Sequence, residues 1–306
     1  MSTNNLSQLP IFNVLLFSLF WALQIFVAKL AFEGGADPVS FTIQSGIVAF
    51  IILGSYILPR KYKALMNTPK EIIAGLLLAN GIHFGLGIFF CNAGTALTSA
   101  INVGFLIKFG LITTTVLALI VLKEKMTLSK IITILLMLTG SLLISTKGKA
   151  IIPQFGDILI IVACLCWSTA NVLVRKFLRG SDLSDEIVTL LRPVAGIPLL
   201  LAFVVLSPLY PEPIKRVFQV DILEIPFPFL VVGNGFFLAL LFLYLNRTLK
   251  VASASYLTMM SMITPVIVTV LAVAFLKEEM NWIQIIGGAL IISSGISTYY
   301  LQIDNQ

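Results

Sequence analysis

The composition of this 306-residue chain excludes a soluble globular domain. Hydrophobic residues make up 58% of it, charged residues 11%, and the mean hydropathy is +1.02, whereas ordinary globular chains carry about 25% charged residues. The net charge of +6 does not indicate nucleic-acid binding, because the basic residues lie in short connections between apolar runs, where they fix topology and meet anionic lipid headgroups.

Apolar runs follow one another along the chain, each close to the ~20 residues that a spanning helix needs. They cover residues 11–32, 38–58, 71–91, 96–122, 129–146, 156–177, 186–207, 225–245, 251–276 and 282–301. The breaks between them carry Gly and Pro turn signals, such as Gly34-Gly35. The sequence therefore predicts an all-α, multi-pass membrane protein with ten transmembrane helices in a lipid bilayer.

One segment of the chain occurs twice. Residues 80–125 match residues 234–279 at a constant offset of 154, without a gap. The matching words are Asn80-Gly81 with Asn234-Gly235, Thr115–Ala118 with Thr269–Ala272, and Leu122–Glu124 with Leu276–Glu278. Ten helices then divide into five and five, and an odd number per half makes the second half enter the membrane from the opposite side. We predict two inverted five-helix repeats, 11–146 and 156–301, which is the usual build of a secondary transporter.

The distribution of Lys and Arg predicts the orientation. If the amino terminus is inside, the cytoplasmic connections hold twelve Lys and Arg residues and the outer connections hold six. Cytoplasmic loops carry the excess of positive charge in most membrane proteins. Both termini are therefore expected in the cytoplasm.

Short words in a fixed order give the chain a family resemblance. Each half opens with an aromatic-Trp helix and closes with Leu-Lys-Glu and a Gly-containing last helix. The words are Phe20-Trp21, Cys166-Trp167, Leu122–Glu124, Leu276–Glu278, Leu138–Gly140 and Ile286–Gly288. Over roughly residues 11 to 300 the chain resembles the EamA type of the drug/metabolite transporter superfamily. The resemblance implies an inner-membrane carrier of small metabolites, often amino acids and frequently exported, with a central cavity and peripheral fifth and tenth helices.

Lys108 is the sharpest individual signal. It lies near the middle of the 96–122 run, ~18 Å from either interface at 1.5 Å per residue. A charge at that depth costs at least ~2.5–3.5 kcal/mol on insertion scales, so it is expected to face a wet cavity or a partner. The functional readings are a contact for an anionic, carboxylate-bearing solute or a proton site. The alternative is a hydrated cavity lysine without a substrate role.

Amides and aromatic rings at one-turn spacing are the other candidate cavity residues. His83 follows Asn80 by about one turn, and Asn234 is the repeat counterpart of Asn80. Trp21 with Gln24, and Trp167 with Asn171, pair an aromatic ring with an amide and would suit an amphipathic ligand. The structural alternatives are a histidine bonded to a neighbouring helix and Trp residues that serve packing.

Three further positions concern motion and the cavity mouth. Pro265 should kink the ninth helix, and Gly110 takes the corresponding place in the fourth run, so both are hinge candidates. Arg192 lies about seven residues into its helix, where it either guides anions or caps the mouth by bonding backbone carbonyls; the second is favoured. Glu124, at a helix end, is expected to be an exposed charge that pairs with a neighbouring Lys.

Residue types also weigh against other function classes. The chain has one His, and its three cysteines, Cys91, Cys164 and Cys166, lie in apolar runs without metal-ligand spacing. No P-loop is present, so neither a cofactor nor direct ATP drive is expected, and a lipid-modifying enzyme would need an acid pair or metal cluster. The favoured function is alternating-access transport; the alternative is an uncoupled facilitator, because proton relays commonly use intramembrane Asp or Glu.

Overall fold

The computed structural model describes residues 10–98, 103, 105–124, 126–212, 214–276 and 279–303, and within them it contains helices and no strand. In chain order the elements are α1 (Pro10–Glu33), α2 (Pro38–Asn67), α3 (Lys70–Asn80), η2 (Gly81–Leu86), α4 (Gly87–Ala96), α6 (Phe109–Val121), α7 (Leu128–Thr146), α8 (Phe155–Leu178), α9 (Asp185–Val205), η3 (Ser207–Leu209), α10 (Ile214–Phe218), α11 (Pro228–Val251), α12 (Ala254–Met260), η4 (Ser261–Ile263), α13 (Thr264–Leu276) and α14 (Trp282–Ile303).

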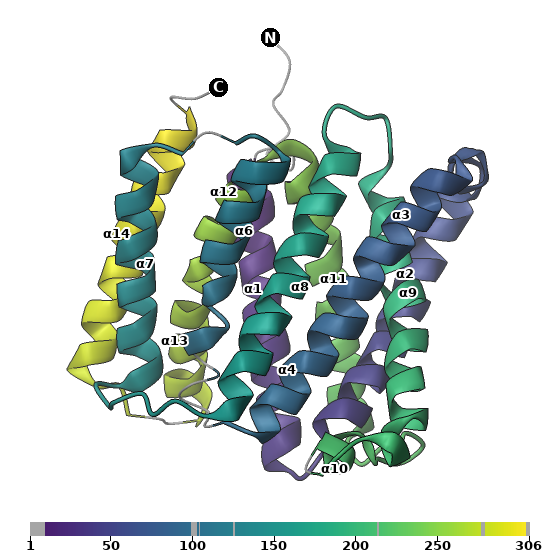
Figure 1. The fold of residues 1–306 in the computed structure, drawn as a ribbon, viewed down its shortest axis with the longest axis horizontal. Helices are drawn as coiled ribbons and strands as arrows, with labels where there is room; N and C mark the ends of the chain where they lie inside the picture. The colour runs from purple at the N-terminus through teal and green to yellow at the C-terminus, as the bar shows by residue number, and fades with distance from the viewer. Residues whose placement is uncertain are drawn as a thin grey trace.

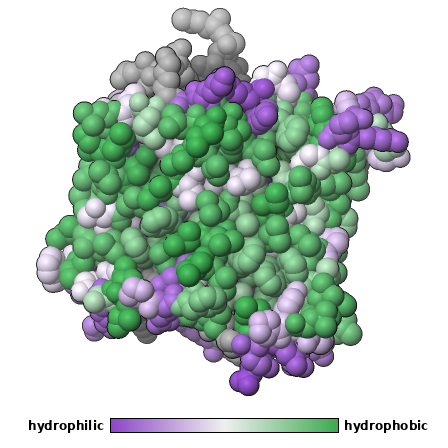
Figure 2. Space-filling view, in the orientation of Figure 1, coloured by the Kyte–Doolittle hydropathy of each residue, from purple (hydrophilic) through white to green (hydrophobic). Residues whose placement is uncertain are grey.

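The helices stand roughly parallel to one another and form a single bundle (Figure 1). Eight helical stretches are long and apolar enough to cross a membrane, and Phe109–Val121 and Trp282–Ser297 are shorter apolar helices. A broad apolar belt covers the visible face of the bundle, and polar residues collect at its two ends (Figure 2). The chain is a multi-pass membrane protein, while the total of ten spanning helices stays a prediction.

Local sequence signals account for several helix starts. Asp37 caps α2, its carboxylate accepting from the backbone N–H groups of Val39 at 2.9 Å and Ser40 at 2.8 Å. Pro38 and Pro228 occupy the first positions of α2 and α11, where a missing N–H has no cost. Because these signals coincide with the edges of the apolar runs, the expected helix positions agree with the structure to within a few residues for most runs.

Two apolar runs are interrupted where continuous helices were expected. Ile107 and Lys108 form a turn before α6, with the backbone N–H of Lys108 bonded to Phe105 O at 3.0 Å. In the other half, the 3₁₀ segment η4 separates α12 from α13. These two breaks are 154 residues apart, the offset of the sequence repeat. Residues 99–102 and 104 of the 96–122 run lie outside the described part of the structure.

Helices of the first half pack against helices of the second in matching pairs. α1 packs on α11 and α4 packs on α8, while α2 contacts both α11 and α9. The pair α7 and α14 lies side by side at one edge of the bundle (Figure 1). Gly140 and Gly287 allow this close crossing, since a Cβ on Gly140 would lie 2.6 Å from Gly287 O.

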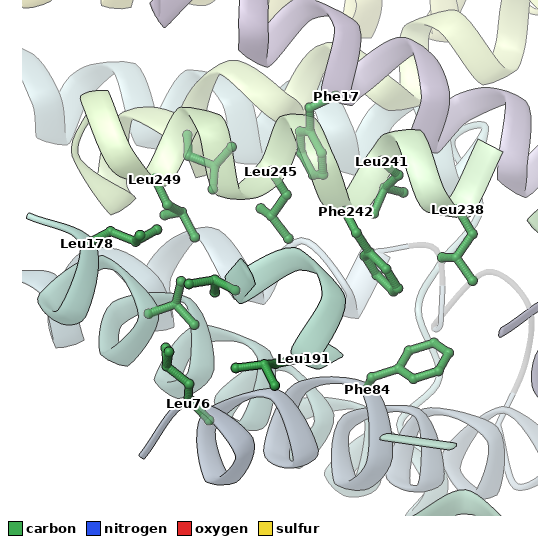
Figure 3. Packing of buried hydrophobic residues seen from close by; sticks show 14 of the residues in the cluster. Phe17, Leu76, Phe84, Leu178, Leu191, Leu238, Leu241, Phe242, Leu245 and Leu249 are labelled. Atoms are coloured by element: carbon green, nitrogen blue, oxygen red, sulfur yellow. The ribbon is translucent and has the colours of Figure 1, made fainter. Parts of the chain in front are cut away.

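The largest buried cluster lies between α2, α3, α9 and α11. Leu76, Leu191, Leu249 and Phe242 are members that are at most 6% exposed. Figure 3 shows Leu245 and Leu249 of α11 in the space between this helix and the helices that carry Leu178 and Leu191. Some of its members, Phe84 and Phe242 among them, also line the cavity described below, so the cluster forms part of the cavity wall.

Candidate functional site

A cavity of about 530 Å³ lies between the two halves of the chain. Its described lining comes from α1, α2, η2, α4, the 107–114 region, α7, α8, α11 and the α12–α13 stretch. Of the candidate positions, the lining includes the following: Trp21, Gln24, His83, Lys108, Gly110, Trp167, Asn171, Asn234 and Pro265. Most of the remaining lining is aliphatic or aromatic, so the cavity suits an amphipathic solute.

Lys108 enters this cavity from the break in the fourth apolar run. It is the N-cap residue of α6, and its ammonium nitrogen lies 5.6 Å from the ring centroid of Trp21, within cation–π range. No ion pair joins Lys108 to a carboxylate in the described residues, and no Asp or Glu is found in the described lining. The ammonium group of Lys108 therefore places a positive charge in this part of the cavity.

Trp167 and His83 form a second aromatic part of the wall. The indole N–H of Trp167 donates to the backbone carbonyl of His83 at 3.1 Å, and the two ring centroids are 6.5 Å apart. Gly87 makes this approach possible, because a Cβ there would lie 2.3 Å from the indole nitrogen. The Trp167 ring is thus held in one orientation against the cavity.

His83 lies in η2, a π-helical segment within the third apolar run. Short π-helical stretches are rare and are often found at functional sites. Sequence periodicity predicts one regular helix over 71–91, so this bulge is a difference between expectation and structure. The imidazole Nδ1 of His83 is enclosed and has no hydrogen-bond partner among the described residues.

An amide pair joins α1 of the first half to α11 of the second at the cavity wall. The side-chain amide of Asn234 donates to the backbone carbonyl of Gln24 at 2.8 Å, and the amide of Gln24 lies 3.5 Å from Asn234 Oδ1. Asn171 also lines the cavity, and its Oδ1 has no partner in the described part of the chain. These amides give the wall hydrogen-bonding capacity without charge.

Two expected site residues lie elsewhere. Asn80 is fully buried and its amide faces α9, at 3.4 Å from Val188 O, because it is on the side of α3 away from the cavity. Arg192 does not cap a mouth: it is fully buried, and its described hydrogen bond goes to the side chain of Asn246 rather than to backbone carbonyls. Packing of neighbouring helices around α9 encloses a position that counting from the helix end placed near the surface.

Hydroxyl groups of the wall were not expected from the sequence. Ser168 lies 2.5 Å from Thr113 Oγ1 and accepts from Thr114 Oγ1 at 2.8 Å, which joins α8 to α6. Thr258 and Ser261 also line the cavity. Their spacing of about one helical turn within apolar runs is a signal that a search for polar faces would have detected.

The hinge candidates lie at the two breaks. Gly110 follows the turn at 107–108, and a Cβ on this glycine would have no neighbouring atom within 4 Å among the described residues. Pro265 is the second residue of α13, directly after η4. Both line the cavity, so a change of angle at either break would alter its shape.

Contacts between the halves close the end of the bundle at which α1 begins. The carboxylate of Glu124 accepts from Ala254 N at 3.1 Å and from Ser255 Oγ at 2.5 Å. Lys61 also pairs with Glu186 at 3.6 Å across the halves. The expectation that Glu124 is an exposed charge was wrong, since it is half-buried against the start of α12. Glu278, its repeat counterpart, lies outside the described residues.

Comparisons of the sequence and of the structure with known proteins each find matches that cover nearly the whole chain. A family model described as the EamA-like transporter family matches residues 8–146 and again residues 154–300. An "Uncharacterized transporter YyaM" from Bacillus subtilis (strain 168) is 26% identical over 300 residues, covering 94% of this chain and 92% of that protein. A solved crystal structure has the same fold with a TM-score of 0.73 at 16% identity, covering 94% of this chain and 97% of its own.

Proposed function

Since the chain belongs to the EamA-like transporter family of the drug/metabolite transporter superfamily, and such proteins carry small solutes through membranes, we propose the following specific function. The protein is a secondary transporter that exports small amphipathic solutes with a carboxylate group, such as amino acids or their relatives, across the cell inner membrane. It works by alternating access between two inverted five-helix halves.

The observation that carries this proposal is the position of Lys108. Its ammonium group lies in the cavity at the N-terminal end of the half-helix α6. Discontinuous helices whose N-termini point at anionic substrate groups are a recurrent substrate site in secondary transporters. A carboxylate bound here would form a charge-assisted hydrogen bond with the ammonium group.

The rest of the cavity supports an amphipathic solute. Trp21 and Trp167 offer flat apolar faces, whereas Gln24, Asn171 and Asn234 offer amide groups. Such a wall can cover the carbon skeleton of a small metabolite and bond its neutral polar groups. The volume of about 530 Å³ is within the ordinary range for small-molecule sites.

Alternating access is supported by the asymmetry of the two ends. The helices α2 and α11 begin at the end of the bundle opposite the start of α1. Their residues Thr42 and Asn234 line the cavity and lie only a few residues from these helix starts, so the cavity reaches close to that end. At the other end, Leu249 and Tyr256 are at most 1% exposed and Glu124 joins the halves. The paired packing of α1 with α11 and α4 with α8 supports halves that move against each other.

An uncoupled facilitator is the second candidate. The described lining has no Asp or Glu, and intramembrane carboxylates are common parts of proton relays. The two candidates differ in one measurement: a coupled carrier moves solute against its gradient when a proton or sodium gradient is applied to proteoliposomes. A facilitator brings the two sides to equal concentration under the same conditions.

The proposed substrate class is tested by comparing the medium of cells that overproduce the protein with that of cells overproducing Lys108→Met. Mass spectrometry should show small carboxylates enriched in the medium of the first cells and not of the second. Uptake of the enriched compounds by proteoliposomes then measures transport directly. Enrichment of cationic or neutral compounds alone would rule out the carboxylate class.

A further inference from the structure

Arg192 is a second cation inside the bundle besides Lys108, and the proposed transport mechanism gives it no role. Its side chain is fully buried in α9 and does not line the cavity. The Nη2 atom donates to Asn246 Oδ1 at 3.4 Å, which is a long hydrogen bond. The Nε and Nη1 atoms have no partner in the described part of the protein.

The acids closest to Arg192 along its own helix are engaged elsewhere. Asp185 lies 3.6 Å from Arg247 and 3.9 Å from Lys250. Glu186 lies 3.6 Å from Lys61 and 4.0 Å from Arg247. Within the described residues no carboxylate pairs with Arg192, and a guanidinium does not give up its proton in proteins. Its positive charge is therefore uncompensated.

Only one layer of aromatic rings separates this charge from the cavity. The guanidinium carbon lies 5.2 Å from the ring centroid of Phe242, which lines the cavity. Phe84, also in the lining, meets Phe242 edge-on at 5.4 Å, and Figure 3 shows the two rings facing each other from separate helices.

This ring layer is tightly packed. A Cβ on Gly196 would lie 2.3 Å from Phe84, and one on Gly46 would lie 3.1 Å from the same ring. The Arg192 side chain itself is fully buried, so water screens its charge only weakly. The field of Arg192 therefore extends into a cavity whose described lining contains one cation, Lys108, and no anion.

From this arrangement we propose that Arg192 determines the charge preference of the cavity: through the Phe84–Phe242 wall it favours anionic solutes and excludes cationic ones, without touching either. The proposal deepens the transport function above and rests on it. Lys108 then supplies the direct contact, and Arg192 supplies the longer-range selection against amines. A purely structural arginine would instead be expected to have its N–H groups paired.

Binding of three solutes of similar shape and different charge tests this assignment. The probes are 3-phenylpropionate, its neutral amide and 3-phenylpropylamine. Trp21 and Trp167 line the cavity, and Trp282 is 67% exposed, so Trp282→Phe leaves the two cavity indoles as fluorescence reporters. Titration of the full-length protein in nanodiscs gives each Kd without requiring transport.

In Arg192→Gln we expect the Kd of the carboxylate to rise three- to tenfold and that of the amine to fall by a similar factor. The Kd of the amide should stay within twofold. Arg192→Lys should retain the preference of the parent. Arg216→Gln is the matched control, because it removes the same charge from an 80% exposed side chain and should change none of the three.

Asn246→Asp gives an independent test that keeps the buried arginine. It places a carboxylate, at unchanged volume, on the atom that Arg192 already contacts, so the field is neutralised and the fold is supported. The same loss of anion preference is expected. Equal changes for all three probes, or an unchanged carboxylate-to-amine ratio in Asn246→Asp, would overturn the proposal. If the parent protein binds the carboxylate in preference to the amine as expected but transports no solute in proteoliposomes, the proposed transport function would be contradicted and the proposal for Arg192 would stand.

Discussion

Lys108 is the residue at which solute recognition is expected to be most sensitive. Met262 is its counterpart in the second half, so the fold accommodates an apolar side chain at this depth. Lys108→Met should insert at least as well as the parent, because it removes the cost of a charge in the membrane. Loss of a charged partner costs ~1.5–3 kcal/mol, so uptake of carboxylates at low concentration should fall roughly ten- to a hundredfold.

The control for this prediction is Met262→Leu, which changes the corresponding position without changing charge. Thermal unfolding in detergent and uptake of radiolabelled carboxylates would be measured for both variants. If Lys108→Met transported every tested anion at the parental rate, Lys108 would be a hydrated cavity residue. Binding would then depend on the wall formed by Trp21, His83 and Trp167.

For single residues, the depth of a polar or aromatic side chain along its helix correctly indicates several that line the cavity. The same depth does not indicate which side chains point away from the cavity. Lys108, Trp21 and Trp167 lie near the middle of their runs, and the structure places all three in the lining. Arg192 also carries a positive charge, but its side chain points from α9 onto Asn246 and Phe242 of α11. The direction in which a side chain points depends on helix rotation, which is set by tertiary packing rather than by local periodicity.

Among the helices, the break before α13 is expected to control the rate of motion. In Pro265→Ala the new backbone N–H could bond to Ser261 O and continue the helix across η4. The variant should therefore fold and insert normally, while the turnover rate falls several-fold. Pro59→Ala is the control, since Pro59 lies within α2 and outside the cavity lining. An unchanged turnover in stopped-flow uptake would make Gly110 the better hinge candidate.

The contact of Glu124 with α12 is expected to stabilise closure of one end. Glu124→Gln weakens charge-assisted hydrogen bonds to Ala254 N and Ser255 Oγ, worth ~1.5–3 kcal/mol when fully formed and less at this half-buried position. We expect cysteines placed near this end of the cavity to react several-fold faster with a polar maleimide. A matched Ser255→Ala should show a smaller increase, and equal rates in all three proteins would show that the contact does not control closure.

Element positions follow from the sequence because their causes are local. Asp37, Pro38 and the apolar periodicity place the start of α2 without information from elsewhere in the chain. The interruptions at η2 and at 107–108 do not follow from the sequence in this way. They depend on contacts made by other helices, such as the indole of Trp167 that bonds the His83 carbonyl, and a single sequence does not show those contacts.

For the whole molecule, duplication is the feature from which most of the architecture can be inferred. The repeated segment predicts that breaks come in pairs, and the breaks at Ile107-Lys108 and Ser261-Met262 are related by the same offset. The duplication cannot predict where the halves differ. Lys108 against Met262 makes the cavity lining asymmetric in charge, because both positions line the cavity and only one of them carries a cation.

The inverted arrangement itself predicts the membrane side of each loop. Lys63 and Lys149 are both exposed; an arrangement of ten helices with cytoplasmic termini places the first inside and the second outside. Lys63→Cys and Lys149→Cys, each in a background with Ala or Ser at the three native cysteines, would be labelled with a membrane-impermeant maleimide. Intact cells should label position 149 strongly and position 63 only after permeabilisation, because the reagent reaches one face. Labelling of both positions from outside would mean that an even number of helices spans the membrane between them. The two halves would then not be inverted, and alternating access between inverted halves would no longer apply.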